Sequence, residues 1–276
     1  MSARNCSIAA TTAAASDSEA PVETISMRGL GGLRSPLRLI SARTLTCERV
    51  SPVPVFDAQA VLAAVSPAAA VERTREAFLR HHAGEWVMPA KVYLDAPPAG
   101  DFRAMPARGS GLAILKWVTS FPGNPERGLP VVTGALLISS ADTGELVAIA
   151  DCGAVTSLRT GAAAAVSAQA LAAGASGTVG LIGSGVNGTW AARCLAAVGF
   201  GPGVCSDARH EAARSLATEL DWQVGDREAA AGQDVVVTVT PGDQPVVLAT
   251  DVRAGQHLAV LGADAHGKAE VEREAR

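Results

Sequence analysis

Two patterns of apolar and polar positions divide the chain beyond residue 50. From residue 90 to residue 151, short apolar stretches alternate with turns that contain Pro, Gly, Asp or Asn. Stretches of this length and spacing predict a mostly antiparallel sheet. They read "AKVYLD", "DFRAMPA", "LAILKWV", "PVVTGALLIS" and "ELVAIAD".

One helix is predicted before this sheet, over residues 66–84. Ser66 is a favourable N-cap residue, and Pro67 suits the first helical position. Gly84 is expected to end the helix. The apolar side chains that fall on roughly one face are Ala70, Val71, Ala77, Phe78 and Leu79.

The pattern changes after residue 153. The segment "AVTSLRTGAAAAVSAQALAAG" predicts one long helix, which Thr156 or Ser157 caps and Gly174 closes. The later apolar runs "TVGLIG", "GVCSD", "DVVVTVT" and "HLAVLGA" alternate with helical stretches. That alternation is typical of a parallel βαβ sheet.

These patterns predict an α/β fold with two domains. A mixed or antiparallel α+β domain is expected over residues 50–155, and a linking helix over residues 156–173. A Rossmann-type parallel sheet is expected over residues 174–276. Residues 1–49 are low in complexity and are expected to be a disordered or wrongly assigned extension. A transit peptide is the alternative there, although the acidic residues of this segment argue against it.

Composition narrows the classes of protein. Of 276 residues 48% are hydrophobic, which describes a globular body, and the net charge of −4 argues against a nucleic-acid-binding protein. The sequence contains no apolar run long enough to span a membrane. The five cysteines include no CxxC pair, so we expect reduced thiols in a cytoplasmic protein rather than disulfides or a zinc site.

A dinucleotide-binding loop is predicted in "TVGLIGSGVNGTWAARCLAAVG". Gly183, Gly185 and Gly188 have GxGxxG spacing between a buried strand and a helix. Asp207 follows Gly188 by 19 residues, at the end of the next apparent strand. This context supports a nucleotide site, because Gly183 makes the turn, Gly185 admits the pyrophosphate and Gly188 lets helix and strand pack.

Asp207 favours NAD over NADP, because a carboxylate binds both ribose hydroxyls and repels a 2′-phosphate. Arg209 is a reason for caution, since an arginine can bind that phosphate. Thr240 lies where the fourth strand of a dinucleotide-binding fold ends, and it either lines the nicotinamide or serves as a turn residue. The predicted cofactor-binding residues are Gly183, Ser184, Gly185, Val186, Asn187, Gly188, Asp207, Arg209, Thr160 and Thr240.

Four cations in the first domain are candidate substrate ligands: Lys91, Arg103, Lys116 and Arg159. Each one alone is most simply a snorkelling side chain or a structural ion pair. Four of them beside a nicotinamide site suggest an anionic substrate, most simply a carboxylate. Lys116 is notable because it interrupts the apolar run "LAILKWV".

Several long segments, in order along the chain, resemble one known family. They are "MPAKVYLD", "GDFRAMPA", "LKWVTSFPGNPERGLP", "TGELVAIAD", "SLRTGAAAA", "GLIGSGVNG" and "GADAHGKAE". From about Val50 to Arg276 the chain resembles the ornithine cyclodeaminase/μ-crystallin family. The forms "MPAKVYL", "RAMP" and "LKWV…PGNP" are most similar to its archaeal-type alanine dehydrogenase branch.

The resemblance implies roles for these residues. Lys91, Arg103 and Arg159 would hold the substrate carboxylate, and Lys116 and Asp264 would be catalytic. The implied reaction is NAD-dependent oxidation of a small L-amino acid to an imine, followed by hydrolysis to a 2-oxo acid and ammonia. Ornithine cyclodeamination and imine reduction use the same residues and stay open. A non-catalytic nucleotide-binding protein like μ-crystallin is a further alternative. The resemblance also implies a homodimer, formed through the first domain.

The sequence departs from the family pattern in three places. Val131 stands where the family usually has Thr near the nicotinamide, and Asn187 stands where it usually has Gln. The family also continues for several tens of residues beyond the position of Arg276. We therefore expect a dinucleotide-binding domain that is incomplete at its C-terminus, and weak or absent activity for this chain.

Overall fold

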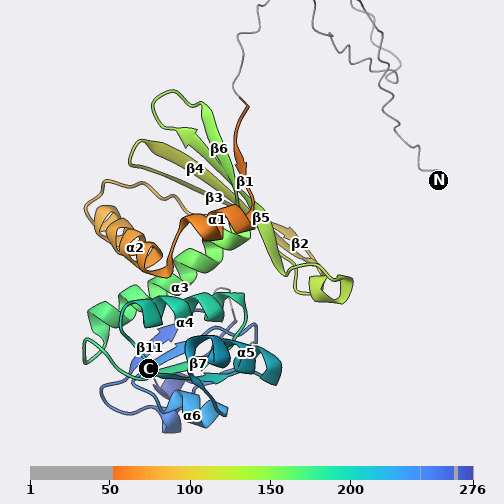
Figure 1. Ribbon diagram of the computed structural model, residues 1–276. Helices are drawn as coiled ribbons and strands as arrows, with labels where there is room; N and C mark the ends of the chain where they lie inside the picture. The colour runs from red at the N-terminus through yellow and green to blue at the C-terminus, as the bar shows by residue number, and fades with distance from the viewer. Residues whose placement is uncertain (1–51, 243, 264–266, 276) are drawn as a thin grey trace, which may run out of the picture. The chain divides into compact units, whose positions relative to one another are not determined.

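The structure is a computed structural model that describes residues 52–242, 244–263 and 267–275. This part of the chain contains two sheets (Figure 1). The six-stranded sheet has the order β1-β6-β5-β4-β3-β2, in which only the pairing of β1 with β6 is parallel. Its strands are β1 (Val55–Phe56), β2 (Val92–Ala96), β3 (Gly100–Gly109), β4 (Leu112–Ser120), β5 (Val132–Ser140) and β6 (Leu146–Asp151).

The five predicted stretches are therefore strands β2 to β6, and β1, with two residues, is too short to give a periodic signal. The turn after β4 contains a short 3₁₀ helix, η1 (Asn124–Arg127). Asn124 closes this turn by donating from its side-chain amide to the Pro130 carbonyl oxygen at 2.8 Å. The sequence "PGNPERGLP" thus joins β4 to β5 compactly.

Two helices precede β2. Helix α1 (Ala58–Ala64) is capped by Asp57, and α2 (Pro67–His82) is capped by Ser66, as predicted. The predicted apolar face of α2 is only partly correct. Ala70 and Val71 are buried, but 56% of Phe78 and 59% of Leu79 remain exposed. The second half of α2 borders an open groove beside α3, so its apolar side chains have no facing layer.

Helix α3 (Cys152–Leu171) connects the two sheets and starts earlier than predicted. Its N-cap is Asp151 and not Thr156 or Ser157, because the Asp151 carboxylate accepts the Ala154 N–H at 2.6 Å. The helix therefore begins directly at the end of β6, without a loop. Small side chains let α3 pack closely against both β5 and the helix α4 (Val186–Ala197) (Figure 1).

The second sheet is parallel and has the order β11-β10-β7-β8-β9. Its first strand in the sequence, β7, lies in the middle, and the strand order reverses between β7 and β10. This is the doubly wound topology predicted for the second domain, and the fold class is α/β. The strands are β7 (Val179–Ile182), β8 (Gly203–Ser206), β9 (Gln223–Val224), β10 (Val235–Thr238) and β11 (His257–Val260).

Successive residues of these strands alternate between two apolar layers, as strand geometry requires. Val179, Leu181 and Val237 face the layer that contains α3, α4 and helix α5 (His210–Leu220). Ile182 and Val236 belong to the other layer, together with residues of helix α6 (Arg227–Ala231) and with Val247 and Val271. Because both faces are covered, the strands read as continuous apolar runs.

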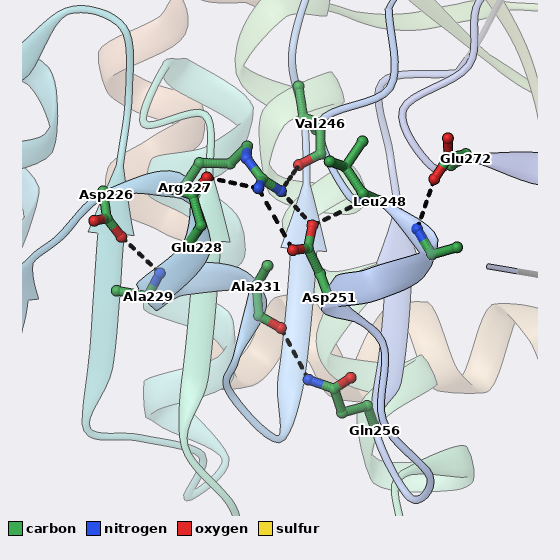
Figure 2. A network of polar contacts seen from close by, with 11 residues as sticks. Asp226, Arg227, Glu228, Ala229, Ala231, Val246, Leu248, Asp251, Gln256 and Glu272 are labelled. Carbon is green, nitrogen blue, oxygen red and sulfur yellow. Dashed lines mark hydrogen bonds and ion pairs between the residues drawn. The ribbon is translucent and has the colours of Figure 1, made fainter.

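A network of polar contacts fixes the connection between β10 and β11 to α6 (Figure 2). The Arg227 guanidinium donates to the Val246 carbonyl oxygen at 3.1 Å and to the carboxylate of Asp251. That guanidinium lowers the pKa of the Asp251 carboxyl group. Asp251 belongs to a short 3₁₀ helix, η2 (Ala249–Asp251), and Gln256 donates to the Ala231 carbonyl oxygen at 2.9 Å.

The last described residues belong to the apolar layer that contains α6 and Val247. Residue Val271 forms a bridge with Val247, and a 3₁₀ turn, η3 (Arg273–Ala275), comes after it. Among the described residues, the structure holds no helix that is long and apolar enough to cross a membrane.

Candidate functional site

Lys116 lies on the face of the six-stranded sheet that α3 covers. In β4 the side chains alternate, so Ile114, Lys116 and Val118 point one way and Trp117 points the other. Val118 is buried, whereas Trp117 is 38% exposed. One face of β4 is covered by α3, and the residues on its other face are also apolar. The residues on either side of Lys116 in the sequence are therefore all apolar. The lysine is on the covered face, within electrostatic range of Cys152 and Arg159 of α3.

The surroundings of Lys116 lower its pKa from 10.5 to about 8. Burial is the main cause, because it disfavours the charged ammonium group. The positive charges of Arg159, Arg103 and Lys91 lower the pKa further, while Cys152 raises it. An amine with a pKa near 8 exchanges protons close to neutral pH, which an ordinary surface lysine does not do.

Arg103 and Lys91 meet at one aromatic ring. Arg103 is paired across β2 and β3 with Tyr93, and its guanidinium carbon lies 5.4 Å from the centre of the Tyr93 ring. The Lys91 ammonium lies 4.9 Å from the same ring centre. Asp101, two residues along β3, accepts hydrogen bonds from Arg103 at 2.5 and 3.0 Å. Tyr93 and Asp101 therefore hold the two cations in place.

One stripe of α3 adds the other members of this cluster. Cys152 and Arg159 are seven residues apart, close to two helical turns, so they share a face of α3. Both influence the pKa of Lys116, which places this stripe beside the lysine. Cys152 is fully buried, and its sulfur lies 3.7 Å from the Thr156 hydroxyl. Three of the predicted residues, Lys91, Arg103 and Arg159, thus all act electrostatically on the fourth, Lys116.

The glycine loop joins β7 to α4. Gly183 has a φ of +105°, which L side chains rarely adopt, and its N–H donates to the Ser206 carbonyl oxygen at 2.8 Å. A Cβ added at Gly188 would lie 1.9 Å from the Gly183 oxygen, so α4 packs directly on the turn. Gly185 is the N-cap of α4, and a Cβ there would meet only an Arg209 nitrogen, at 3.7 Å.

Asp207 lies directly after β8 and faces the glycine loop. Its carboxylate accepts the Ser184 N–H at 2.6 Å and the Arg209 N–H at 2.8 Å. The Arg209 Nε lies 3.5 Å from the same carboxylate, and most of the arginine side chain is exposed. A hollow of about 400 Å³ opens beside the loop. It is lined by Ser184, Gly185, Val186, Thr189, Trp190, Arg209 and Ala212.

Two buried hydroxyl groups in this region have no hydrogen-bond partner within the chain. They belong to Thr160 in α3 and Ser184 in the glycine loop, and each residue is at most 6% exposed. Among the described residues these are the only buried side-chain nitrogen or oxygen atoms left without a partner. A buried hydroxyl that lacks a partner is unfavourable, so both sites are suited to a ligand that supplies one.

The remaining predicted residues have different outcomes. Thr240 follows β10, but its N–H and its hydroxyl both donate to the carboxylate of Glu270, at 2.6 and 2.9 Å. Asn187 and Val186 form the first turn of α4. Asp264 lies outside the described residues. The sequence did not single out Cys152, Tyr93, Asp101 or Glu270. A signal existed only for Cys152, because it precedes Arg159 by two helical turns.

The described residues contain no group of three or more His, Cys, Asp or Glu side chains that could hold a metal ion. Three cysteines, Cys152, Cys194 and Cys205, are free and buried. Burial raises the pKa of the Cys194 thiol to about 12 and that of the Cys205 thiol to about 11. These two thiols are therefore inert near neutral pH.

The family model described as the ornithine cyclodeaminase/mu-crystallin family matches residues 55–276. The chain belongs to this family. The resemblance carried by the sequence segments is confirmed. The family match includes both sheets, the cation cluster and the glycine loop.

Two curated members of the family show how far the similarity extends. The alanine dehydrogenase of Archaeoglobus fulgidus is 40% identical over 209 residues, which cover 74% of this chain and 65% of the relative. The L-lysine cyclodeaminase of Streptomyces rapamycinicus is 38% identical over 189 residues, which cover 64% of this chain and 54% of the relative. The chain thus spans less than two thirds of the length of either relative.

A solved structure of a family member has the same fold. It is an archaeal alanine dehydrogenase dimer with bound NAD, 37% identical to this chain, with a TM-score of 0.75. The match covers 80% of this chain and 70% of that one. The family therefore includes dehydrogenases and cyclodeaminases that act on amino acids.

Proposed function

We propose that the protein is an NAD-dependent oxidoreductase that deaminates a small L-amino acid to a 2-oxo acid and ammonia. The observation that carries this proposal is Lys116, an amine whose pKa is lowered to about 8 beside three other cations. Such a group can both attract a carboxylate and exchange a proton near neutral pH. The similarity to the alanine dehydrogenase of Archaeoglobus fulgidus supports the same reaction.

The residues of the glycine loop fit a dinucleotide. The N–H groups at the start of α4 and the open space beside Gly185 suit a pyrophosphate. The Thr160 and Ser184 hydroxyls, which lack partners, can donate to its oxygens. Each Asp207 oxygen keeps a lone pair for ribose hydroxyls, which favours NAD. A bound NAD would supply the hydride acceptor for the oxidation.

The cation cluster fits the carboxylate end of an amino acid. Arg103 is held by Asp101 and Tyr93, so its guanidinium is oriented before a substrate arrives. Arg159 and Lys91 add positive charge from α3 and from the start of β2. Together they bind and orient the carboxylate, which also offsets the mutual repulsion of the cations.

Lys116 acts on protons in this proposal. In its neutral form it accepts a proton from the substrate amine or from the water that adds to the imine carbon. Asp264, expected from the family resemblance to activate that water, lies outside the described residues. Since only the neutral amine accepts a proton, amino-acid oxidation should increase with pH through about 8.

The test is turnover of a panel of substrates, followed by NADH absorbance, in the protein extended to the length of the relatives that this chain matches only in part. Alanine, ornithine, lysine, cyclic imines, and pyruvate with ammonia separate the dehydrogenase from the cyclodeaminase and the imine reductase. Lys116→Ala should lower kcat by about a hundredfold or more. Lys116→Arg, which keeps the charge but does not lose its proton, should be equally slow. If both variants keep full activity, Lys116 has no role in proton transfer.

A nucleotide-binding protein without catalytic activity is the competing function. It is distinguished by NADH binding without turnover of any member of the panel. If NADH does not bind either, the proposal as a whole is wrong.

We also propose that the protein forms a homodimer in the cytoplasm. The sheet face opposite α3 is apolar, with Val92 64%, Leu94 59% and Trp117 38% exposed. Their cross-strand partners place them on the same face. The similar archaeal alanine dehydrogenase is a dimer. Cell fractionation tests the location.

A further inference from the structure

Glu270 is a fully buried carboxylate that no step of the proposed reaction uses. It accepts four hydrogen bonds. The donors are the Thr238 hydroxyl at 3.0 Å, the Thr240 N–H at 2.6 Å, the Thr240 hydroxyl at 2.9 Å and the Gly262 N–H at 2.5 Å. A buried carboxyl group is tolerated only when hydrogen bonds compensate for the loss of water, and four donors provide that compensation.

These donors lie at a particular place in the fold. Thr238 is the last residue of β10, Thr240 follows it by two residues, and Gly262 follows β11, so all three are at the carboxyl edge of the parallel sheet. Ligands of open α/β sheets bind at that edge, beside the point where the strand order reverses. That point lies between β7 and β10.

The contact between Glu270 and Gly262 is close. A Cβ added at Gly262 would lie 2.6 Å from the Glu270 carboxyl carbon. The backbone of Glu270 is also fixed, since its carbonyl oxygen accepts the N–H groups of Val246 and Val247 at 2.7 and 3.0 Å. Backbone hydrogen bonds thus fix the main chain of Glu270, and its carboxylate in turn binds the segments at the ends of β10 and β11.

Thr240 connects this carboxylate to the glycine loop. The strained turn at Gly183 packs against the end of β10. A Cβ there would lie 2.6 Å from the Val239 oxygen and 3.4 Å from the Thr240 methyl carbon. The polar groups of Thr240 are bound by Glu270, so its methyl group is left to face the turn.

We infer that Glu270 is a positioning residue for the dinucleotide loop, acting through Thr240 on the turn at Gly183. The inference rests on the proposed function, because it assigns the loop a cofactor. A carboxylate suits this role since it only accepts, and it meets four donors. Glutamine at this position turns an NH₂ group toward either the Thr240 N–H or the Gly262 N–H, so the segment after β10 or the segment after β11 must move away.

The test is Glu270→Gln in the full chain, with Asp234→Asn as the matched control. Asp234 lies at the opposite edge of the same parallel sheet. There its carboxylate accepts hydrogen bonds from the Thr178 N–H at 3.0 Å and from the Thr178 hydroxyl at 2.9 Å. Both variants should lower the melting temperature. Titration with NADH, well below melting, should give a Kd about tenfold higher for Glu270→Gln only. KM for NAD should increase in parallel, while kcat changes less.

The outcomes separate a failure of the proposed function from a failure of the role assigned to Glu270. If the wild-type chain does not bind NADH, the proposed function is wrong. If it binds and Glu270→Gln has an unchanged Kd, or Asp234→Asn weakens binding equally, the inference about Glu270 is overturned. Should Glu270→Gln fail to fold, Thr240→Val removes one donor and keeps the shape of the side chain. An increase of about threefold in its Kd supports the inference, and an unchanged Kd overturns it.

Discussion

The free energy of unfolding should depend on the protonation of Lys116. Its pKa is lowered to about 8 in the folded chain, against 10.5 for an ordinary lysine. Between these pH values the unfolded chain binds more protons than the folded chain, so stability increases as pH rises through this range. Below pH 8 the Lys116 amine is charged in both the folded and the unfolded chain. The folded chain then carries the full free-energy cost of burying that charge.

Lys116→Met should therefore stabilise the fold at pH 7, by about 1–2 kcal/mol. It should also remove the increase in stability between pH 8 and 10. Urea unfolding at both pH values measures the two effects. An unchanged dependence on pH in the Met variant would mean that the amine is solvated in the folded chain.

Asp207 should determine the choice between NAD and NADP. Asp207→Asn removes the charge that repels a 2′-phosphate, and it leaves Arg209 beside the hollow to bind that phosphate. The ratio of kcat/KM for NADP to that for NAD should increase about tenfold. Adding Arg209→Ala should abolish the gain. A gain that persists in the double variant would exclude Arg209 as the phosphate ligand.

At the scale of elements, the crossing of α3 and α4 depends on Gly161. A Cβ at this position would lie 2.4 Å from the Trp190 carbonyl carbon and 2.6 Å from the Ala191 nitrogen. These are backbone atoms, which cannot rotate away. Gly161→Ala should therefore lower the free energy of unfolding by about 2 kcal/mol or more.

The control for this prediction is Gly123→Ala in the turn after β4. That glycine has a φ of −78° and open space around it, so a methyl group fits there. Its effect should stay within about 0.5 kcal/mol. Thermal unfolding of both variants separates a tight helix crossing from a general intolerance of alanine. Equal melting temperatures of the two variants would mean that the crossing of α3 and α4 does not require glycine at position 161.

The sequence predicts these elements unevenly. Four strands of the parallel sheet are apolar runs bounded by turn residues, so they can be located without tertiary information, whereas β9 has only two residues and no such run. The start of α3 cannot, because Asp151 ends β6 and caps the helix at once. The exposure of Phe78 and Leu79 depends on how far the neighbouring layer extends, which a helical pattern does not encode. Glu270 is beyond prediction for a similar reason, since its donors come from two other strands.

The candidate site follows the same division. Spacing predicts the glycine loop and Asp207, whereas the common role of the four cations is what the family resemblance implies. Their supporting contacts with Tyr93, Asp101 and Cys152 depend on strand register and on helix phase. Register is readable only when one face of a strand is polar, and from Leu112 to Val118 β4 is apolar on both faces except at Lys116.

At the scale of the whole molecule, the outer face of the six-stranded sheet should control assembly. Trp117 stacks on Phe102 with ring centres 5.6 Å apart, and Leu94 lies opposite Phe102 in the sheet. Leu94→Lys combined with Trp117→Lys should convert a dimer into a monomer, because it places charges in the proposed interface. Light scattering coupled to gel filtration measures the mass.

Leu171→Lys is the control for assembly. Leu171 is 72% exposed at the end of α3, so it tests whether any added lysine on an exposed apolar position changes the mass. It should leave the mass of the dimer unchanged. A double variant on the sheet face that keeps the same mass as the parent would locate the interface elsewhere.

The adjacency of Arg159 and Thr160 on α3 has a consequence for how the proposed activity could change its substrate. Neighbouring helical residues point about 100° apart, so one turn of α3 carries a member of the cation cluster and, in another direction, the buried Thr160 hydroxyl that lacks a partner. An insertion or deletion before this turn rotates both groups together. New specificities should therefore arise from exchanges on β2 to β4, while the length of α3 stays fixed.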